Sequence, residues 1–132
     1  MAKILVIEDD RSILENTLEI LEYEGFEVIG AGDGREGLAQ VQRNSPDMII
    51  CDILMPKLDG YGVLKALRAN PLTRQIPLVF ISAVPSEEIL AATTKMGASD
   101  YLVKPFRASD LIRIVNAVLQ NLQNGFSTQS NS

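Results

Sequence analysis

Histidine and tryptophan are absent from this sequence of 132 residues, and cysteine occurs once, as Cys51. A zinc site built from His and Cys ligands is therefore excluded, and so is a disulfide within the chain. A lone thiol is typical of a reducing compartment, so we expect a soluble, cytoplasmic domain. Because only 5% of the residues are aromatic, the core must consist mainly of Ile, Leu, Val and Ala.

Long apolar runs and clusters of basic residues are missing as well. No apolar stretch reaches the length of a membrane-spanning helix, and the run that follows Lys3 is too short for a signal peptide. The formal net charge is −5, with Lys and Arg scattered along the chain. We therefore expect neither membrane insertion nor direct nucleic-acid binding by these residues.

Short apolar segments alternate with longer amphipathic segments throughout the chain. The apolar segments are predicted strands, and they cover residues 4–7, 26–29, 48–51, 78–81 and 101–103. The amphipathic segments are predicted helices, and they cover residues 11–24, 34–44, 61–69, 86–96 and 109–122. Gly25 is predicted to end the first helix, whereas Ser86 and Ser109 are predicted to cap the fourth and fifth.

Alternating strands and helices with short connections predict an α/β fold with a parallel sheet covered on both faces. A dinucleotide-binding fold would have a glycine-rich turn after the first strand, but residues 8–10 are acidic and would repel a pyrophosphate. We therefore predict a flavodoxin-like, doubly wound sheet of five strands in the order 2-1-3-4-5, with five helices. Residues 1–122 form this domain, and residues 123–132 are expected to be a flexible polar tail or a truncated linker.

Ligands of doubly wound sheets bind at the carboxyl ends of the strands, next to the switch in strand order. In the predicted order this switch lies between the first and third strands, which end in residues 8–10 and in Asp52. The carboxylates at this point would repel one another unless a cation lies between them, and an all-oxygen ligand set suits Mg²⁺. A solvated acidic turn that caps the first helix is the alternative for residues 8–10.

Two further polar residues follow the fourth and fifth strands at the same edge. Ser82 supplies a hydroxyl, and Lys104 supplies a charge suited to a phosphoryl oxygen. Ser82 could instead be a turn residue, and Lys104 could merely offset the carboxylates. Lys104 precedes Pro105, and we hypothesise a cis peptide bond between them.

Taken together, these motifs resemble the receiver domain of two-component response regulators, over residues 3–122. The motifs that carry the resemblance are residues 8–10, Asp52-Ile53-Leu54-Met55-Pro56, Asp59-Gly60, Ser82-Ala83 and Lys104-Pro105-Phe106. Each motif alone is weak, whereas the whole set at this spacing is highly specific.

The resemblance implies a role for each matching residue. Asp52 matches the phosphoacceptor, and Lys104 matches the lysine that contacts a phosphoryl oxygen. The Mg²⁺ ligands would be Asp9, Asp10, Asp52 and the backbone carbonyl of Leu54. Ser82 and Tyr101 match the pair that moves when the domain is phosphorylated, although Tyr101 could be an ordinary half-buried strand residue.

The resemblance also implies partners. A histidine kinase or a phosphotransfer protein would supply the phosphoryl group. The surface of the fourth helix, fifth strand and fifth helix would then act on a downstream protein or a covalently linked effector domain, with a phosphorylation-linked dimer as a further expectation. Leu54 and Val84 flank the reaction centre and are apolar, so neither could orient water, and slow loss of the phosphoryl group is predicted.

Three other functions compete with this one. A phosphatase of the haloacid-dehalogenase type would have a second Asp two residues after its nucleophile, where this sequence has Leu54. A flavodoxin-like cofactor binder is disfavoured by the acidic turn after the first strand. A pseudo-receiver would have lost part of the residue set that is complete here. We therefore expect a regulatory domain whose only chemistry is its own phosphorylation and dephosphorylation, and no enzyme.

Overall fold

The computed structural model describes residues 2–55, 57–83 and 87–130, with side chains described as far as Asn121. Ser86 and Val84, for which the sequence suggests a helix cap and a position beside the reaction centre, lie outside these residues. The elements follow one another in strict alternation: β1 (Lys3–Ile7), α1 (Arg11–Tyr23), β2 (Glu27–Ala31), α2 (Gly34–Asn44), β3 (Met48–Asp52), α3 (Gly60–Ala69), β4 (Leu78–Ser82), α4 (Glu87–Lys95), β5 (Asp100–Val103) and α5 (Ala108–Ser130).

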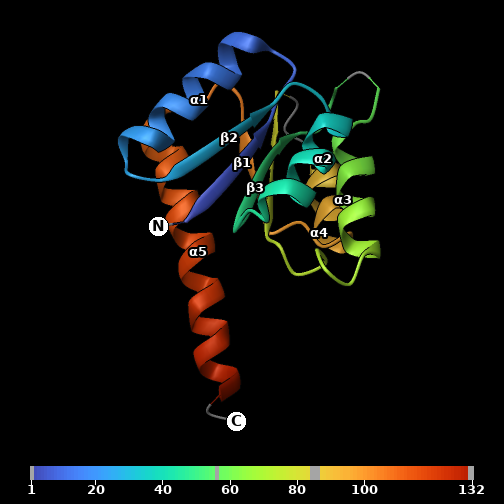
Figure 1. The fold of residues 1–132 in the computed structure, drawn as a ribbon, viewed down its shortest axis with the longest axis vertical. Coiled ribbons are helices and arrows are strands. Elements are labelled where there is room, and N and C mark those ends of the chain that lie inside the picture. Colours follow the sequence, from blue (N-terminus) through green and yellow to red (C-terminus); the bar gives the residue numbers. More distant parts are fainter. Residues whose placement is uncertain (1, 56, 84–86, 131–132) are drawn as a thin grey trace.

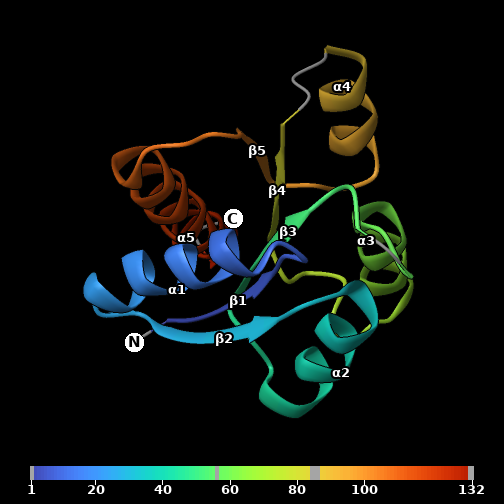
Figure 2. The same cartoon turned by 90° about the horizontal axis from the view of Figure 1, so that it is seen from above.

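All five strands are parallel and form one sheet in the order β2-β1-β3-β4-β5, which confirms the predicted fold. Figure 1 shows the helices wrapped around this sheet, and Figure 2 shows α1 and α5 on one face with α2, α3 and α4 on the other. Because every strand runs in the same direction, the carboxyl ends of all five meet at a single edge.

Each face of the sheet is covered by its own apolar core, because successive side chains of a strand point to opposite faces. In β1, Ile4 and Val6 pack with α1 and α5, whereas Leu5 and Ile7 pack with the helices of the other face. The strands β3 and β4 are buried throughout, which explains their unbroken apolar sequences.

Aspartates cap the helices that follow the first three strands. The side chains of Asp10, Asp33 and Asp59 accept hydrogen bonds from backbone N–H groups in the first turns of α1, α2 and α3. Gly25, with φ at 96°, follows α1 in the left-handed conformation that glycine favours, as predicted for the residue that ends this helix.

The start of α5 differs from the prediction. Ser109 lies inside the helix, and the carbonyl of Arg107 accepts the first helical hydrogen bond, from the Leu111 N–H at 3.1 Å. The carboxylate of Asp110 accepts a bond from the Arg107 N–H at 3.3 Å, which satisfies a donor that would otherwise be left over at the helix end. The bond from the Arg107 N–H to the Asp110 carboxylate favours a start of α5 before Ser109.

The backbone of α5 is helical through Ser130, beyond Leu122, where the polar tail was expected to begin. This part of the sequence is rich in Gln, Asn and Ser but contains no proline, so nothing in it forbids a helix. The division of the chain at residue 122 stays a prediction.

Candidate functional site

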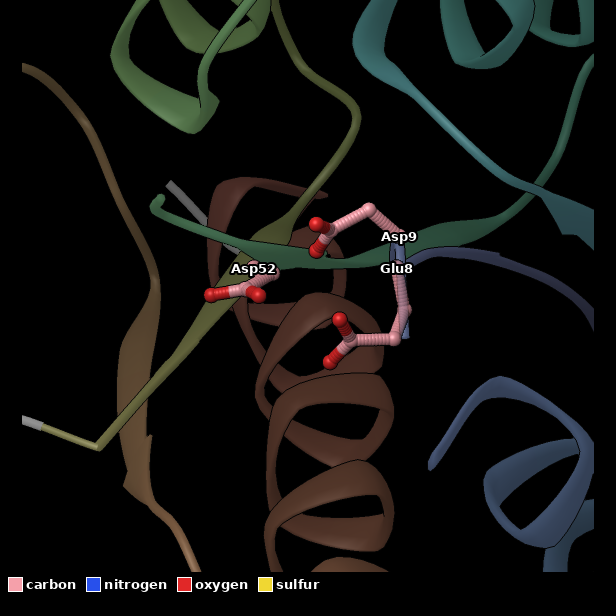
Figure 3. Close-up of side chains that lie close together, drawn as sticks. All are labelled: Glu8, Asp9 and Asp52. Carbon is pink, nitrogen blue, oxygen red and sulfur yellow. The ribbon is translucent and has the colours of Figure 1, made fainter. Parts of the chain in front are cut away.

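Three carboxylates gather at the carboxyl edge of the sheet, from the ends of β1 and β3. Glu8, Asp9 and Asp52 each offer an oxygen, and these oxygens all lie within 4.8 Å of one another (Figure 3). Glu8 is 1% exposed and Asp52 is 6% exposed, whereas Asp9 faces solvent. Three carboxyl groups at this spacing, two of them buried, can all be ionised only beside a compensating cation.

Lys104 supplies part of that compensation. Its Nζ donates a hydrogen bond to Asp52 Oδ2 at 3.0 Å and lies 2.6 Å from Glu8 Oε1. Burial lowers the pKa of the Lys104 ammonium, but the hydrogen bonds and charges of Glu8 and Asp52 outweigh burial and raise its pKa above the ordinary value. Lys104 therefore remains a cation between two acidic residues, and one ammonium cannot neutralise three carboxylates.

Glu8 and Asp10, both in the acidic segment after β1, take different positions in the structure. The side chain of Asp10 turns away from the cluster and accepts the Ile13 N–H at 3.1 Å as the N-cap of α1. The alternative of a helix-capping acid thus describes Asp10, and Glu8 joins Asp9 and Asp52 in its place. The Asp10 N–H donates to Glu8 Oε2 at 3.1 Å, so Asp10 supports the cluster through its backbone.

Glu8 has a carboxyl group whose pKa is strongly raised. Burial raises its pKa to about 7; hydrogen bonds from Lys104 and from the Asp10 N–H oppose this rise, and the neighbouring Asp52 adds to it. Further positive charge beside this carboxyl group would favour its ionised form.

The alternation of side chains between the two faces of a strand could have identified Glu8 from the sequence. Every second residue of a strand belongs to one row of side chains on the same face. In β1, Ile4 and Val6 face α1 and α5, and Glu8 is the next residue of that row. Met48 and Ile50 form the equivalent row of β3, which ends at Asp52. Both acids therefore extend buried rows on the same face of the sheet, and Lys104 extends the row of Leu102 in the same way.

The loop after β3 brings backbone groups to Asp52. The Leu54 N–H donates to Asp52 Oδ1 at 3.3 Å, and the Gly60 N–H donates to the Ile53 carbonyl at 2.8 Å. A Cβ on Gly60 would lie 2.6 Å from the Asp52 carbonyl oxygen, so this close return of the chain requires a glycine. The side chain of Leu54 is exposed, and its backbone lies beside the acidic cluster.

Ser82 and Tyr101 lie on the neighbouring strands. Ser82 is the last residue of β4 and is buried, and its carbonyl accepts the Lys104 N–H at 2.9 Å. Tyr101 is half-buried on β5, beside Phe80 of β4 in the strand register. The Lys104–Pro105 peptide bond is cis, as hypothesised. Ser82 and Lys104 lie at the carboxyl ends of β4 and β5, where they were predicted. The roles of Ser82 and Tyr101 in switching stay predictions.

Cys51 lies one residue before the acidic cluster but on the other face of the sheet. It is fully buried among the residues that pack with α2, α3 and α4. Burial raises the pKa of its thiol, and the nearby carboxylates raise it further. The thiol is therefore an inert part of the core.

Open space lies beside Lys104. A cavity of about 440 Å³ is lined by the start of α1 and by the segments after β4 and β5, namely Ser12, Ile13, Asn16, Ala83, Lys104, Pro105 and Phe106. A larger groove of about 1020 Å³ lies between α1 and α5, lined by Ile20, Tyr23 and Ile112 among others and by none of the clustered carboxylates. The smaller cavity touches the site through Lys104 alone, since none of the clustered carboxylates lines it.

A doubly wound α/β domain with acids at its topological switch point defines a class of signalling and ligand-binding modules. Comparison with known proteins identifies the family. The sequence profile described as response regulator receiver domain matches residues 4–116. The chain belongs to this family, the receiver domains of the response regulators of two-component systems.

Individual relatives agree with this membership. The transcriptional regulatory protein PrrA of Mycobacterium tuberculosis is 42% identical over 118 residues, which cover 89% of this chain and 50% of PrrA. The transcriptional regulatory protein CpxR of Escherichia coli is 40% identical over 120 residues, which cover 91% of this chain and 50% of CpxR. The chain thus spans about half the length of these curated relatives.

A solved structure agrees equally well. The chemotaxis protein CheY4 of Vibrio cholerae superposes with a TM-score of 0.86 at 35% identity, over 89% of this chain and 98% of CheY4.

Among the described residues, no helix combines the length and the apolar character needed to cross a bilayer.

Proposed function

We propose that this chain is a phosphorylation-dependent switch that accepts a phosphoryl group on Asp52 from a partner histidine kinase or a phosphotransfer protein. The observation that supports it most directly is Lys104, whose ammonium lies between Asp52 and Glu8 at 3.0 Å and 2.6 Å. A cation held against the acceptor carboxylate is what an incoming, negatively charged phosphoryl group requires.

The transfer itself needs no general base. A carboxylate oxygen of Asp52 forms a bond to phosphorus while the bond between phosphorus and the donor imidazole nitrogen breaks, and the electron pair of that bond stays with the nitrogen. Lys104 offsets the charge that arrives on the phosphoryl oxygens. The Leu54 N–H, which donates to Asp52 Oδ1 at 3.3 Å, orients the carboxylate.

The acidic cluster fits Mg²⁺ in the chemistry of its donors. All of them are oxygens, and the excess of negative charge around Lys104 leaves room for a second, divalent cation. Asp9, Asp52 and the Leu54 carbonyl are the ligands we propose, with Glu8 beside them and Asp10 in its capping role. When bound, Mg²⁺ supplies positive charge next to the phosphoryl oxygens and helps to orient them.

The switch follows from new contacts at the modified residue. A phosphoryl group adds roughly −1.5 to −2 charges and three acceptor oxygens, which Ser82 and Lys104 can reach only by shifting toward Asp52. Tyr101 would follow Ser82, and the surface formed by α4, β5 and α5 would change for a downstream protein, a linked effector domain or a second copy. Slow loss of the phosphoryl group, and a cytoplasmic location, stay predictions.

Intact-mass measurement after incubation with Mg²⁺ and a small acyl-phosphate donor tests this function. We expect a single phosphoryl adduct on the wild type and on Asp47→Asn, whose carboxylate lies at the opposite edge of the sheet and accepts the Lys3 N–H. Asp52→Asn should give no adduct, and neither should the wild type when Mg²⁺ is replaced by a chelator.

The result that would contradict the proposal is equally clear. A folded wild-type chain that acquires no adduct would be a pseudo-receiver with an acidic cluster but no acceptor function. An adduct that persists in Asp52→Asn would move the acceptor to another residue.

A further inference from the structure

Leu58, in the loop between β3 and α3, lies against the first residue of α2, a helix that contributes nothing to the acidic cluster. Gly34 is the first residue of α2 and is buried. A Cβ at this position would collide with the carbonyl oxygen of Leu58 and would lie 2.9 Å from a methyl group of Val63. Only a residue without a side chain lets the helix approach the loop backbone so closely.

Gly34 is not among the described glycines with positive φ, so its role here is close approach and not an unusual backbone conformation. The obstacle to a side chain is a backbone carbonyl, which cannot rotate away as the end of a flexible side chain can. The oxygen of Leu58 also lies at the positive end of the α2 helix, an arrangement that favours the contact electrostatically.

Lys57 shows that the loop is held in a shape that its own sequence does not favour. Its φ is 69°, in the left-handed region that a lysine adopts only when its surroundings impose it. Its ammonium lies 3.6 Å from the carboxylate of Asp33, the N-cap of α2. Because the lysine side chain is mostly exposed, this ion pair adds little, and the backbone contact at Gly34 is the stronger constraint.

The other side of the same loop reaches the acceptor. The Leu54 N–H bonds to the Asp52 carboxylate, and the Gly60 N–H bonds to the Ile53 carbonyl at 2.8 Å. Leu54 is 65% exposed, so its side chain does little to fix its backbone. The orientation of the Leu54 carbonyl therefore depends on contacts that the rest of the loop makes.

We propose that Gly34 is a positioning residue for the metal site: the contact between the start of α2 and Leu58 fixes the backbone of the loop, and with it the position of the Leu54 carbonyl. This inference rests on the proposed function, in which that carbonyl is a Mg²⁺ ligand. A side chain at position 34 must push the loop backbone away, which displaces the ligand and leaves the acceptor and Lys104 where they are.

Calorimetric titration of the whole chain with Mg²⁺ tests the inference without any reaction. Gly34→Ala should weaken Mg²⁺ binding by about tenfold, the size of effect that loss of an outer-shell support has at metal sites. Gly32→Ala is the matched control, since a Cβ there meets only the Glu36 carboxylate, at 3.7 Å. Val41→Ala controls for general loss of packing, because Val41 is buried on the same helix and is absent from the loop contacts. Both controls should bind Mg²⁺ as the wild type does.

The rate of Asp52 phosphorylation at increasing Mg²⁺ gives a second signature. In Gly34→Ala the half-saturating Mg²⁺ concentration should rise, while the rate at saturation stays that of the wild type. Lys57→Gly should keep the wild-type affinity, because glycine adopts the same φ and leaves the contact at Gly34 intact.

A measurement on the wild type decides the matter if Gly34→Ala does not fold. In the ¹⁵N–¹H spectrum, the Gly34 amide should shift on Mg²⁺ addition with the same saturation curve as Leu54, whereas Val41 should not move. The positioning role is overturned if Gly34 stays unshifted, if Gly34→Ala binds Mg²⁺ normally, or if Lys57→Gly loses as much affinity. A wild type that binds no Mg²⁺ at all would instead overturn the metal site of the proposed function.

Discussion

Glu8→Gln is predicted to remove most of the pH dependence of stability between pH 4.5 and pH 7. Burial raises the pKa of Glu8 to about 7 in the folded chain, against an ordinary value of 4.5. Over this range the folded chain holds a proton that the unfolded chain has released, so the unfolded state binds fewer protons. The free energy of unfolding must therefore fall as the pH rises through this window and level off above pH 7.

The size of the effect follows from the same two values. At about 1.4 kcal/mol per pKa unit, a rise from 4.5 to about 7 corresponds to roughly 3 kcal/mol. The pKa of Lys104 is also raised, but the stability it contributes is lost only above its unfolded value of 10.5. The chain has no histidine, the side chain whose ordinary pKa lies close to neutrality.

Urea denaturation at half-unit steps between pH 4.5 and 8, with a chelator present, measures the slope. The chelator is needed because bound Mg²⁺ would add its own pH-dependent stabilisation. Glu22→Gln, at an exposed position of α1, serves as the control and should keep the wild-type slope.

Two results would refute this reasoning. A wild-type free energy of unfolding that stays constant between pH 4.5 and 7 would mean that Glu8 titrates normally despite its burial. A slope that survives in Glu8→Gln would assign the titration to another group.

Three further predictions concern single residues. Asp10→Ala should lower the free energy of unfolding by about 1 kcal/mol through loss of the helix cap and leave Mg²⁺ affinity unchanged in calorimetry, whereas Asp9→Asn should weaken Mg²⁺ binding. Leu64→Ala, at a fully buried position, should cost about 2–5 kcal/mol in urea denaturation, and Leu72→Ala, 89% exposed, less than about 0.5 kcal/mol. Cys51 should react with a thiol reagent only after unfolding, and a fast reaction in the native chain would contradict its burial.

Much of the fold could be predicted because its signals are local and repeated. The unbroken apolar segments of β3 and β4 indicated strands covered on both faces, and Gly25 indicated the end of α1. The position of Lys104 and Asp52 at one edge followed from parallel strands alone. The acidic edge was therefore predictable before any coordinate was known.

The sequence did not predict that the side chain of Glu8 lies in the acidic cluster while that of Asp10 caps α1. Both are acids after β1, and only a competition between two hydrogen bonds separates them. Asp10 is three residues before Ile13, whose free N–H it accepts, so local geometry draws its side chain toward α1. Glu8 lies in the buried row of its strand, where its partner Lys104 comes from a distant segment. The start of α5 at Ala108 is a second such case. The bond from the Arg107 N–H to Asp110 makes Arg107 the residue before the helix, whereas Ser109 was an equally plausible cap from the sequence.

The length of α5 has a mechanical consequence. The helix has 23 residues, which is ~35 Å at 1.5 Å per residue, and Figure 1 shows its later part extending past the sheet. Leu111, Val115 and Val118 anchor the earlier part in the core. The backbone from Val118 to Ser130 forms an arm of roughly 18 Å, so a tilt of roughly 10° at the anchored part displaces the far end by ~3 Å. A small tilt caused by a side-chain rearrangement in the core would thus displace the carboxyl-terminal end of α5 by a distance similar to the length of a hydrogen bond.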